Sequence, residues 1–155
     1  NAVAMRDAGC TLDETVTWLE AEKSTTQIFF TVGDLDYLIK GGRIGKISAM
    51  AGTMLQIKPI ITFAQDGQLQ SVAKVRGRQQ VMRKLVEMTV SRCGSHKRYN
   101  LAVANGGAPE EMETVRQMLT AALPDYDHIW DGEIDGTLSV YIGDGVLGAA
   151  VQVLD

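Results

Sequence analysis

The sequence has little of what marks several common protein classes. Its 155 residues include only two cysteines, Cys10 and Cys93, which lie far apart and form no CxxC pair. Neither a zinc site nor a disulfide framework is indicated, so we expect buried thiols and, by default, a reducing cytoplasm. Apolar runs such as IKPIITFA end well before the roughly 18 residues that a membrane span needs. No signal peptide is recognisable.

Motifs of the common catalytic classes are also missing. The chain contains no HExxH, no GxSxG, no Walker loop and no cluster of metal-ligand residues. His96 lies among basic residues in an expected loop, and His128 lies in an expected strand, where a structural role is favoured. The acidic residues from Asp131 to Asp135 are explained as well by a solvated turn as by catalytic carboxylates. We therefore assign no catalytic residue, no metal and no cofactor.

Charge is unevenly divided along the chain. The formal net charge is −4, yet residues 40–98 carry twelve Lys and Arg against two acidic residues. A basic face of this kind can attract an anionic ligand or an acidic partner, although a solvated face without a partner explains it equally well. Nucleic acid is not expected, because aromatic residues are few and no zinc-finger, helix-turn-helix or RNA-recognition pattern is present.

Hydrophobic periodicity and turn residues predict one α/β domain with a mixed sheet flanked by helices. The residues TLDE, Thr11 to Glu14, form a capping box at the start of a helix that runs to about Ser24. Further helices are expected at 35–40, 46–55, 77–93 and 109–123, and strands at 27–32, 57–63, 68–75, 99–104 and 127–130. The tail from residue 138 is expected to form a strand, a glycine loop and a final strand. Residues 1–9 resemble the end of a helix already under way, so we expect the chain to be a fragment.

Two short stretches carry the strongest local signals. In YLIKGGRIGKISAMAGTM, Gly41 is expected just after a helix, and Gly41-Gly42 with Arg43 has the composition of an anion-facing loop. A helix end followed by a solvated arginine is the alternative, and the stretch alone favours it. The small residues that follow predict close packing against a backbone or a ligand. Asp66-Gly67 between two β-rich runs predicts a tight type I′ hairpin.

The order of these motifs resembles the DegV family. From Ala4 to Arg83 the chain shows, in family order, a Leu-x-Tyr-Leu helix, Lys-Gly-Gly-Arg-Ile, a small-residue helix, an Ile-Lys-Pro-Ile strand, an Asp-Gly hairpin and a basic Lys-x-Arg. Members of that family have two α/β domains. The resemblance therefore implies that residues 1–155 are a DegV-like C-terminal domain and that the N-terminal domain is absent from this chain.

The resemblance also implies a function. Proteins of the family bind a long-chain fatty acid in a tunnel between their domains, and in bacteria that take up exogenous fatty acids they present its carboxylate to a separate ATP-dependent fatty acid kinase. The chain would then be a lipid-binding carrier and not an enzyme. The residues implied at the ligand are Gly41, Gly42, Arg43, Ile44, Ile47, Ala51, Ile60, Tyr141, Gly143 and Gly145, and those implied to face the partner are Lys46, Arg76 and Arg78.

One stretch departs from the family. Its C-terminal glycine loop usually reads His-Thr-Gly-Pro-Gly, whereas residues 141–145 here read Tyr-Ile-Gly-Asp-Gly. Tyr141 can still donate a hydrogen bond to a carboxylate, while Asp144 adds negative charge beside an acidic ligand. Two other functions stay open: an enzyme domain that holds a phosphorylated small molecule through the Arg43 loop, and an interaction module that docks an acidic protein on its basic face.

Overall fold

The computed structural model describes residues 1–50 and 57–155, which contain one six-stranded sheet with the strand order β3-β2-β1-β6-β4-β5. Only the pairing of β4 with β5 is parallel, and the helix between them makes a βαβ unit. The strands are β1 (Thr26–Thr31), β2 (Ile57–Phe63), β3 (Leu69–Arg76), β4 (Tyr99–Gly106), β5 (His128–Glu133) and β6 (Val146–Val153). The predicted mixed sheet flanked by helices is therefore confirmed.

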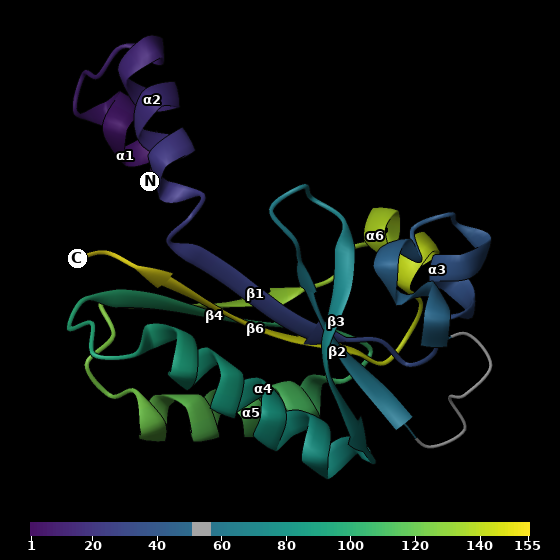
Figure 1. Ribbon diagram of the computed structural model, residues 1–155. Helices are drawn as coiled ribbons and strands as arrows, with labels where there is room; N and C mark the ends of the chain where they lie inside the picture. Colours follow the sequence, from purple (N-terminus) through teal and green to yellow (C-terminus); the bar gives the residue numbers. More distant parts are fainter. Residues whose placement is uncertain (51–56) are drawn as a thin grey trace.

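Two long helices, α4 (Arg78–Cys93) and α5 (Pro109–Ala122), cover one face of the sheet (Figure 1). Pro109 occupies the first turn of α5, where its missing N–H costs no hydrogen bond. At one end of the sheet lie α3 (Asp36–Lys40), the 3-10 helix η1 (Gly45–Met50) and α6 (Gly136–Ile142). In the described part of the chain, no helix has the length and apolar character needed to cross a membrane.

The first two helices stand apart from the sheet. They are α1 (Ala2–Asp7) and α2 (Leu12–Glu22), and neither contains a buried residue (Figure 1). The predicted capping box is present, since the Thr11 hydroxyl accepts from Glu14 N at 3.3 Å and the Glu14 carboxylate accepts from Thr11 N at 2.8 Å. Leu12 and Val16 remain 77% and 48% exposed, so the described residues leave the apolar stripe of α2 uncovered.

The main core lies between the sheet and α4 and α5. Its members include Leu85 and Val115 from the two helices and Leu101 and Val151 from the strands, and each is at most 1% exposed. Complete burial of such side chains contributes roughly 1.5–3 kcal/mol each. A smaller core under α3 and η1 consists of Val32, Leu35, Leu38, Ile47, Ile61 and Val146.

The tail and the Asp66-Gly67 hairpin differ from the sequence-based predictions. Residues 138–142 belong to helix α6 and not to a strand, because the Asp135 carboxylate accepts from Leu138 N at 3.1 Å and caps the helix start. The hairpin is not type I′, since Gly67 has φ +79° but Asp66 does not have positive φ. Its turn is instead closed by Gly67 N donating to Ala64 O at 2.9 Å.

Two further expectations concern the loop after α3. Gly41 ends α3 as its C-cap with φ −79°, as its expected place just after a helix requires, and Gly42 takes the left-handed conformation with φ +69°. The helix expected at 46–55 is observed as the 3-10 helix η1 as far as Met50. Its remainder, including Ala51, lies outside the described residues.

Candidate functional site

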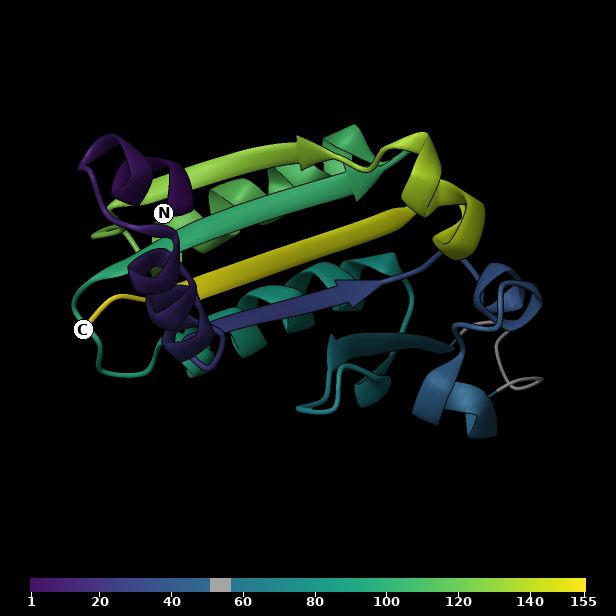
Figure 2. The ribbon, with the colours of Figure 1, turned by 90° about the horizontal axis from the view of Figure 1, so that it is seen from above.

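The face of the sheet opposite α4 and α5 carries small side chains in the neighbouring strands β4 and β6. Ala102 of β4 is paired with Ala150 of β6, and Ala104 with Gly148. Side chains alternate between the faces of a strand, and their neighbours Leu101 and Val103 are buried in the helix-covered core. The four small residues therefore form the floor of a trough on the open face, which Figure 2 shows uncovered by helices along its centre.

Large apolar side chains form the walls of this trough. Ile28, Phe30 and Phe63 stand on the side of β1 and β2, and the rings of Phe30 and Phe63 have centroids 6.0 Å apart. Ile134 and Leu138 stand on the side of β5 and α6. Together with the floor they enclose an apolar groove of about 1020 Å³. Leu138 is 52% exposed and Phe63 48%, so the groove presents bare apolar surface, which is typical of a binding site.

Arg43 and Tyr141 line the groove at the end formed by α3 and α6. The guanidinium carbon of Arg43 lies 4.3 Å from the centroid of the Tyr141 ring, a cation–π contact. Arg43 Nη1 also donates to the carbonyl of Gly41 at 2.6 Å. These contacts place a permanent positive charge and a phenol beside an apolar groove. The pair has the chemistry to receive the acidic end of an amphipathic ligand.

Two glycines allow α3 and α6 to approach each other. A Cβ atom on Gly41 would lie 2.7 Å from the ring of Tyr141, and one on Gly143 would lie 2.5 Å from the ring of Tyr37. Gly143 also has φ +73°, which side-chain-bearing residues rarely adopt. The two glycine loops, 100 residues apart in the sequence, thus pack against each other's tyrosine and hold Tyr141 under Arg43.

The other residues expected at the ligand are placed differently. Gly42 lines the groove, whereas Ile44 packs against the smaller core and Ile47 is buried in it. Ile60 belongs to the main core on the helix-covered face. Gly145 lies beside Gly33 and accepts a hydrogen bond on its carbonyl from Arg78 Nη1 at 2.9 Å. Arg43 and Tyr141, with Gly41 and Gly143 supporting them, are therefore brought together at the groove.

The three residues expected to face a partner lie outside the groove. Lys46 Nζ is 2.7 Å from the Asp66 carboxylate, and this contact holds the pKa of Asp66 below its ordinary value. Arg78 joins α4 to α5 through an ion pair with Glu111, whose pKa its hydrogen bonds lower. Arg76 is exposed at the end of β3.

Arg78 also borders a second, smaller cavity. Its volume is about 590 Å³, and Lys58 lines it together with the start of α5. Lys58 donates to the carbonyl of Gly33, and Glu110 and Glu111 stand at the same cavity. Within residues 1–50 and 57–155, no group of three or more His, Cys, Asp or Glu side chains is placed to hold a metal ion.

Most of the groove was not identified from the sequence. Its floor has a recognisable signal, because small residues occupy every second position at Ala102 and Ala104 and again at Gly148 and Ala150. Its walls have none, since Phe30, Phe63 and Leu138 are far apart in the sequence and meet only through the strand order.

Comparison with known proteins connects this fold to one family. A family model described as an uncharacterised protein of the DegV family matches residues 1–153. A DegV domain-containing protein of Clostridium acetobutylicum is 33% identical over 143 residues, which cover 92% of this chain and 50% of that protein. The chain thus spans about half the length of the curated relatives that it matches.

Solved structures with the same fold include two named for binding fatty acids. The fatty acid binding DegV family protein of Streptococcus agalactiae has a TM-score of 0.86 and 25% identity, and the match covers 100% of this chain and 54% of that one. A stearic acid-binding protein of Eubacterium ventriosum has a TM-score of 0.84 and 26% identity, with 97% and 52% covered. The family model, which matches almost the entire sequence, shows that this chain belongs to the DegV family.

Proposed function

We propose that the groove binds the alkyl chain of a long-chain fatty acid and that Arg43 and Tyr141 receive its carboxylate. The observation that carries this proposal is the combination of an apolar groove with one cationic end, because that pattern matches the two parts of a fatty acid. The two similar solved proteins that are named for binding fatty acids support it. A small phosphorylated metabolite fits less well, since it has no apolar part to occupy the trough.

A second domain completes the site in this proposal. The groove leaves Ile28, Phe63 and Leu138 between 40% and 52% exposed, and α2 likewise leaves its apolar stripe bare. We take residues 1–155 to be the C-terminal domain of a two-domain protein, in which the N-terminal domain covers the open face. The coverage of about half of each relative is consistent with such a division.

The proposal extends to a partner enzyme. The chain acts as a carrier and not as an enzyme, and it presents the bound carboxylate to a separate fatty acid kinase in the cytoplasm. This part rests on the family resemblance, on the exposed Arg43 at the end of the groove and, for the location, on two cysteines that form no disulfide. Lys46 and Arg76 are the exposed cations assigned to that partner.

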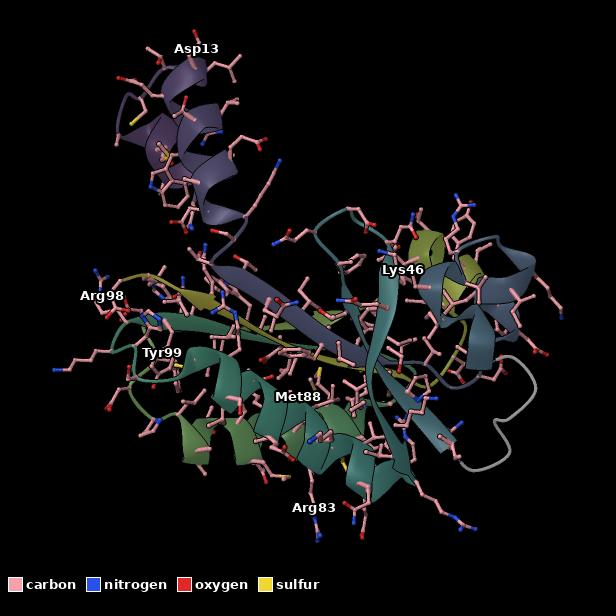
Figure 3. All side chains as sticks on the ribbon, viewed as in Figure 1. Asp13, Lys46, Arg83, Met88, Arg98 and Tyr99 are labelled. Atoms are coloured by element: carbon pink, nitrogen blue, oxygen red, sulfur yellow. The ribbon has the colours of Figure 1, made fainter. Side chains whose placement is uncertain are left out.

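A charge reversal tests the role of Arg43. Arg43→Glu should weaken palmitate binding about tenfold or more, because a charge-assisted hydrogen bond of roughly 1.5–3 kcal/mol is replaced by repulsion. Displacement of a fluorescent fatty acid measures the affinity, and circular dichroism checks the fold. The matched control is Arg83→Glu, since Arg83 points away from the sheet on α4 (Figure 3). Equal affinities of Arg43→Glu and the unchanged chain would remove Arg43 from the site.

The kinase step needs its own assay. With a fatty acid kinase and ATP, the two-domain protein should support acyl phosphate formation, and Lys46→Glu should slow it without changing palmitate affinity. Mass spectrometry of the ligand that co-purifies with the protein distinguishes the carrier function from the two alternatives, an enzyme domain and an interaction module. A phosphorylated metabolite in place of a fatty acid would favour the enzyme domain, and an acidic protein would favour the interaction module.

A further inference from the structure

The side chains on the open face change from apolar to polar along the strands. The register places its side chains in rows across the sheet, and the rows nearest α3 and α6 are small or apolar. One row consists of Phe30, Gly148, Ala104 and Gly132, and the next of Ile28, Ala150, Ala102 and Trp130. The following row, at the end nearest α2, consists of Thr26, Gln152, Asn100 and His128, all of which are polar.

Hydrogen bonds join this polar row to helix α2 and to Asn1, which precedes α1. Asn100 Nδ2 donates to Gln152 Oε1 at 3.1 Å, and Gln152 Nε2 donates to the Glu22 carboxylate at 2.9 Å. Asn1 Nδ2 also donates to Gln152 Oε1, at 3.3 Å. Figure 2 shows α1 and α2 at this end of the sheet and α3 and α6 at the other. The polar row and α2 together form a wall across the trough, which we call the end wall (Asn100, Gln152 and Glu22).

The groove stops where the end wall begins. Its lining reaches Ile28, Ala102 and Ala150 but includes neither Asn100 nor Gln152. Asn100 is only 4% exposed, and its Oδ1 has no hydrogen-bond partner among the described residues. Gln152 is the partly exposed amide of the wall, and an alkyl group laid over it would remove water from a polar group without offering it a hydrogen bond, which is unfavourable.

We propose that the end wall sets the maximum length of the acyl chain that the groove accepts. This inference rests on the proposed function and names the substrate class more narrowly. From Val146, beside the carboxylate end, to Ala150 a strand rises about 13 Å, and Gln152 is about 7 Å further on. An extended palmitate is about as long as the roughly 20 Å from Val146 to Gln152. The additional carbons of a longer acid meet amides that are already hydrogen-bonded to one another, so that acid must displace Gln152 or fold back.

The test compares a long acid with a very long one. Palmitate and docosanoate compete with a fluorescent fatty acid for the chain, and the ratio of their affinities is the readout. The unchanged protein should prefer palmitate at least tenfold. Gln152→Ala opens the wall and should reduce this preference about tenfold, while Gln70→Ala, a matched change on β3 outside the groove, should leave it unchanged.

The possible results distinguish a failure of this inference from a failure of the proposed function. If palmitate and docosanoate bind the unchanged chain equally well, the end wall does not limit length, and the inference is overturned without any variant. A folded Gln152→Ala protein with the original preference overturns it too. Gln152→Leu, which keeps the side-chain size but removes the amide, should also accept the longer acid and covers the case in which Gln152→Ala does not fold. Failure of the two-domain protein to bind any fatty acid would instead overturn the proposed function.

Discussion

The two faces of the sheet use the same strands for different purposes. On the helix-covered face, Leu101 and Val151 are 1% exposed and pack against α4 and α5. On the open face, their neighbours Ala102 and Ala150 leave an apolar trough that nothing in the described chain fills. One face is closed by large residues, whereas the other is kept hollow by small ones. Most of the folding free energy therefore comes from the first face, and the second is available for a ligand.

The largest expected effect concerns the second domain that we propose to cover the open face. Enclosing about 14 methylenes is worth roughly 11 kcal/mol at 0.8 kcal/mol each, and one wall of a shared tunnel supplies about half of that. Association itself costs several kcal/mol. We expect this chain to fold alone and to bind palmitate with a Kd of at best roughly tens of micromolar, measured by calorimetry below the micelle concentration. Submicromolar one-to-one binding would show that the groove needs no second domain.

The next largest effect is expected on the free energy of unfolding, when one leucine is truncated on each face. Leu85→Ala should lower the free energy of unfolding by about 3 kcal/mol, because Leu85 is fully buried and its loss leaves a cavity. Leu138→Ala, at a groove wall and 52% exposed, should change it by less than about 0.5 kcal/mol. Urea unfolding measures both. Similar losses in the two variants would contradict the separation of folding from binding.

A large side chain on the groove floor should weaken ligand binding and leave the stability of the fold nearly unchanged. Ala150→Phe places a ring on the groove floor and should weaken palmitate binding at least tenfold, about 1.4 kcal/mol, with little change in the unfolding midpoint. Val72→Phe is the control, since Val72 is 40% exposed on β3 and lies outside the groove. The displacement assay measures affinity. Unchanged binding by Ala150→Phe would place the ligand elsewhere.

The smallest effect is expected from the ion pair between α4 and α5. Hydrogen bonds from Arg78 hold the pKa of Glu111 below its ordinary value, so the pair stabilises the fold fully above about pH 4.5 and this contribution disappears as the pH falls through the folded-state pKa. Glu111→Gln should cost about 1 kcal/mol at pH 7, since both side chains are partly exposed.

Unfolding curves measured at a series of pH values check this prediction. The difference between Glu111→Gln and the unchanged protein should shrink as the pH falls through the lowered folded-state pKa of Glu111, because below it the glutamate is protonated in both the folded and the unfolded state. Glu87→Gln is the control: its partner Lys84 lies on the same helix, and the Glu87 side chain is 62% exposed. A difference that persists at acid pH would mean that the pair acts through packing and not through charge.

The features of the fold that the sequence predicts correctly are those with a signal within a few neighbouring residues. Thr11 with Glu14 and Pro109 with its acidic first turn mark helix starts within a few residues of sequence, and both were located correctly. Residues 138–142 contain β-branched and aromatic residues, which favour a strand, but the cap at Asp135 starts a helix there. The groove depends on the register of β4 with β6, which joins residues about 45 positions apart. Such pairing is decided by the complete sheet and has no local signature.

The row of Ile28, Ala150 and Ala102 ends at Trp130 on the edge strand β5, and this side chain is 52% exposed. The sequence has only two tryptophans, and the other, Trp18, lies on α2. An indole in contact with water emits at longer wavelength than one in apolar surroundings. Trp130 is therefore an intrinsic optical reporter on the open face of the sheet. A covering domain should shift the emission of Trp130 to shorter wavelength, and Trp18→Phe would isolate that signal.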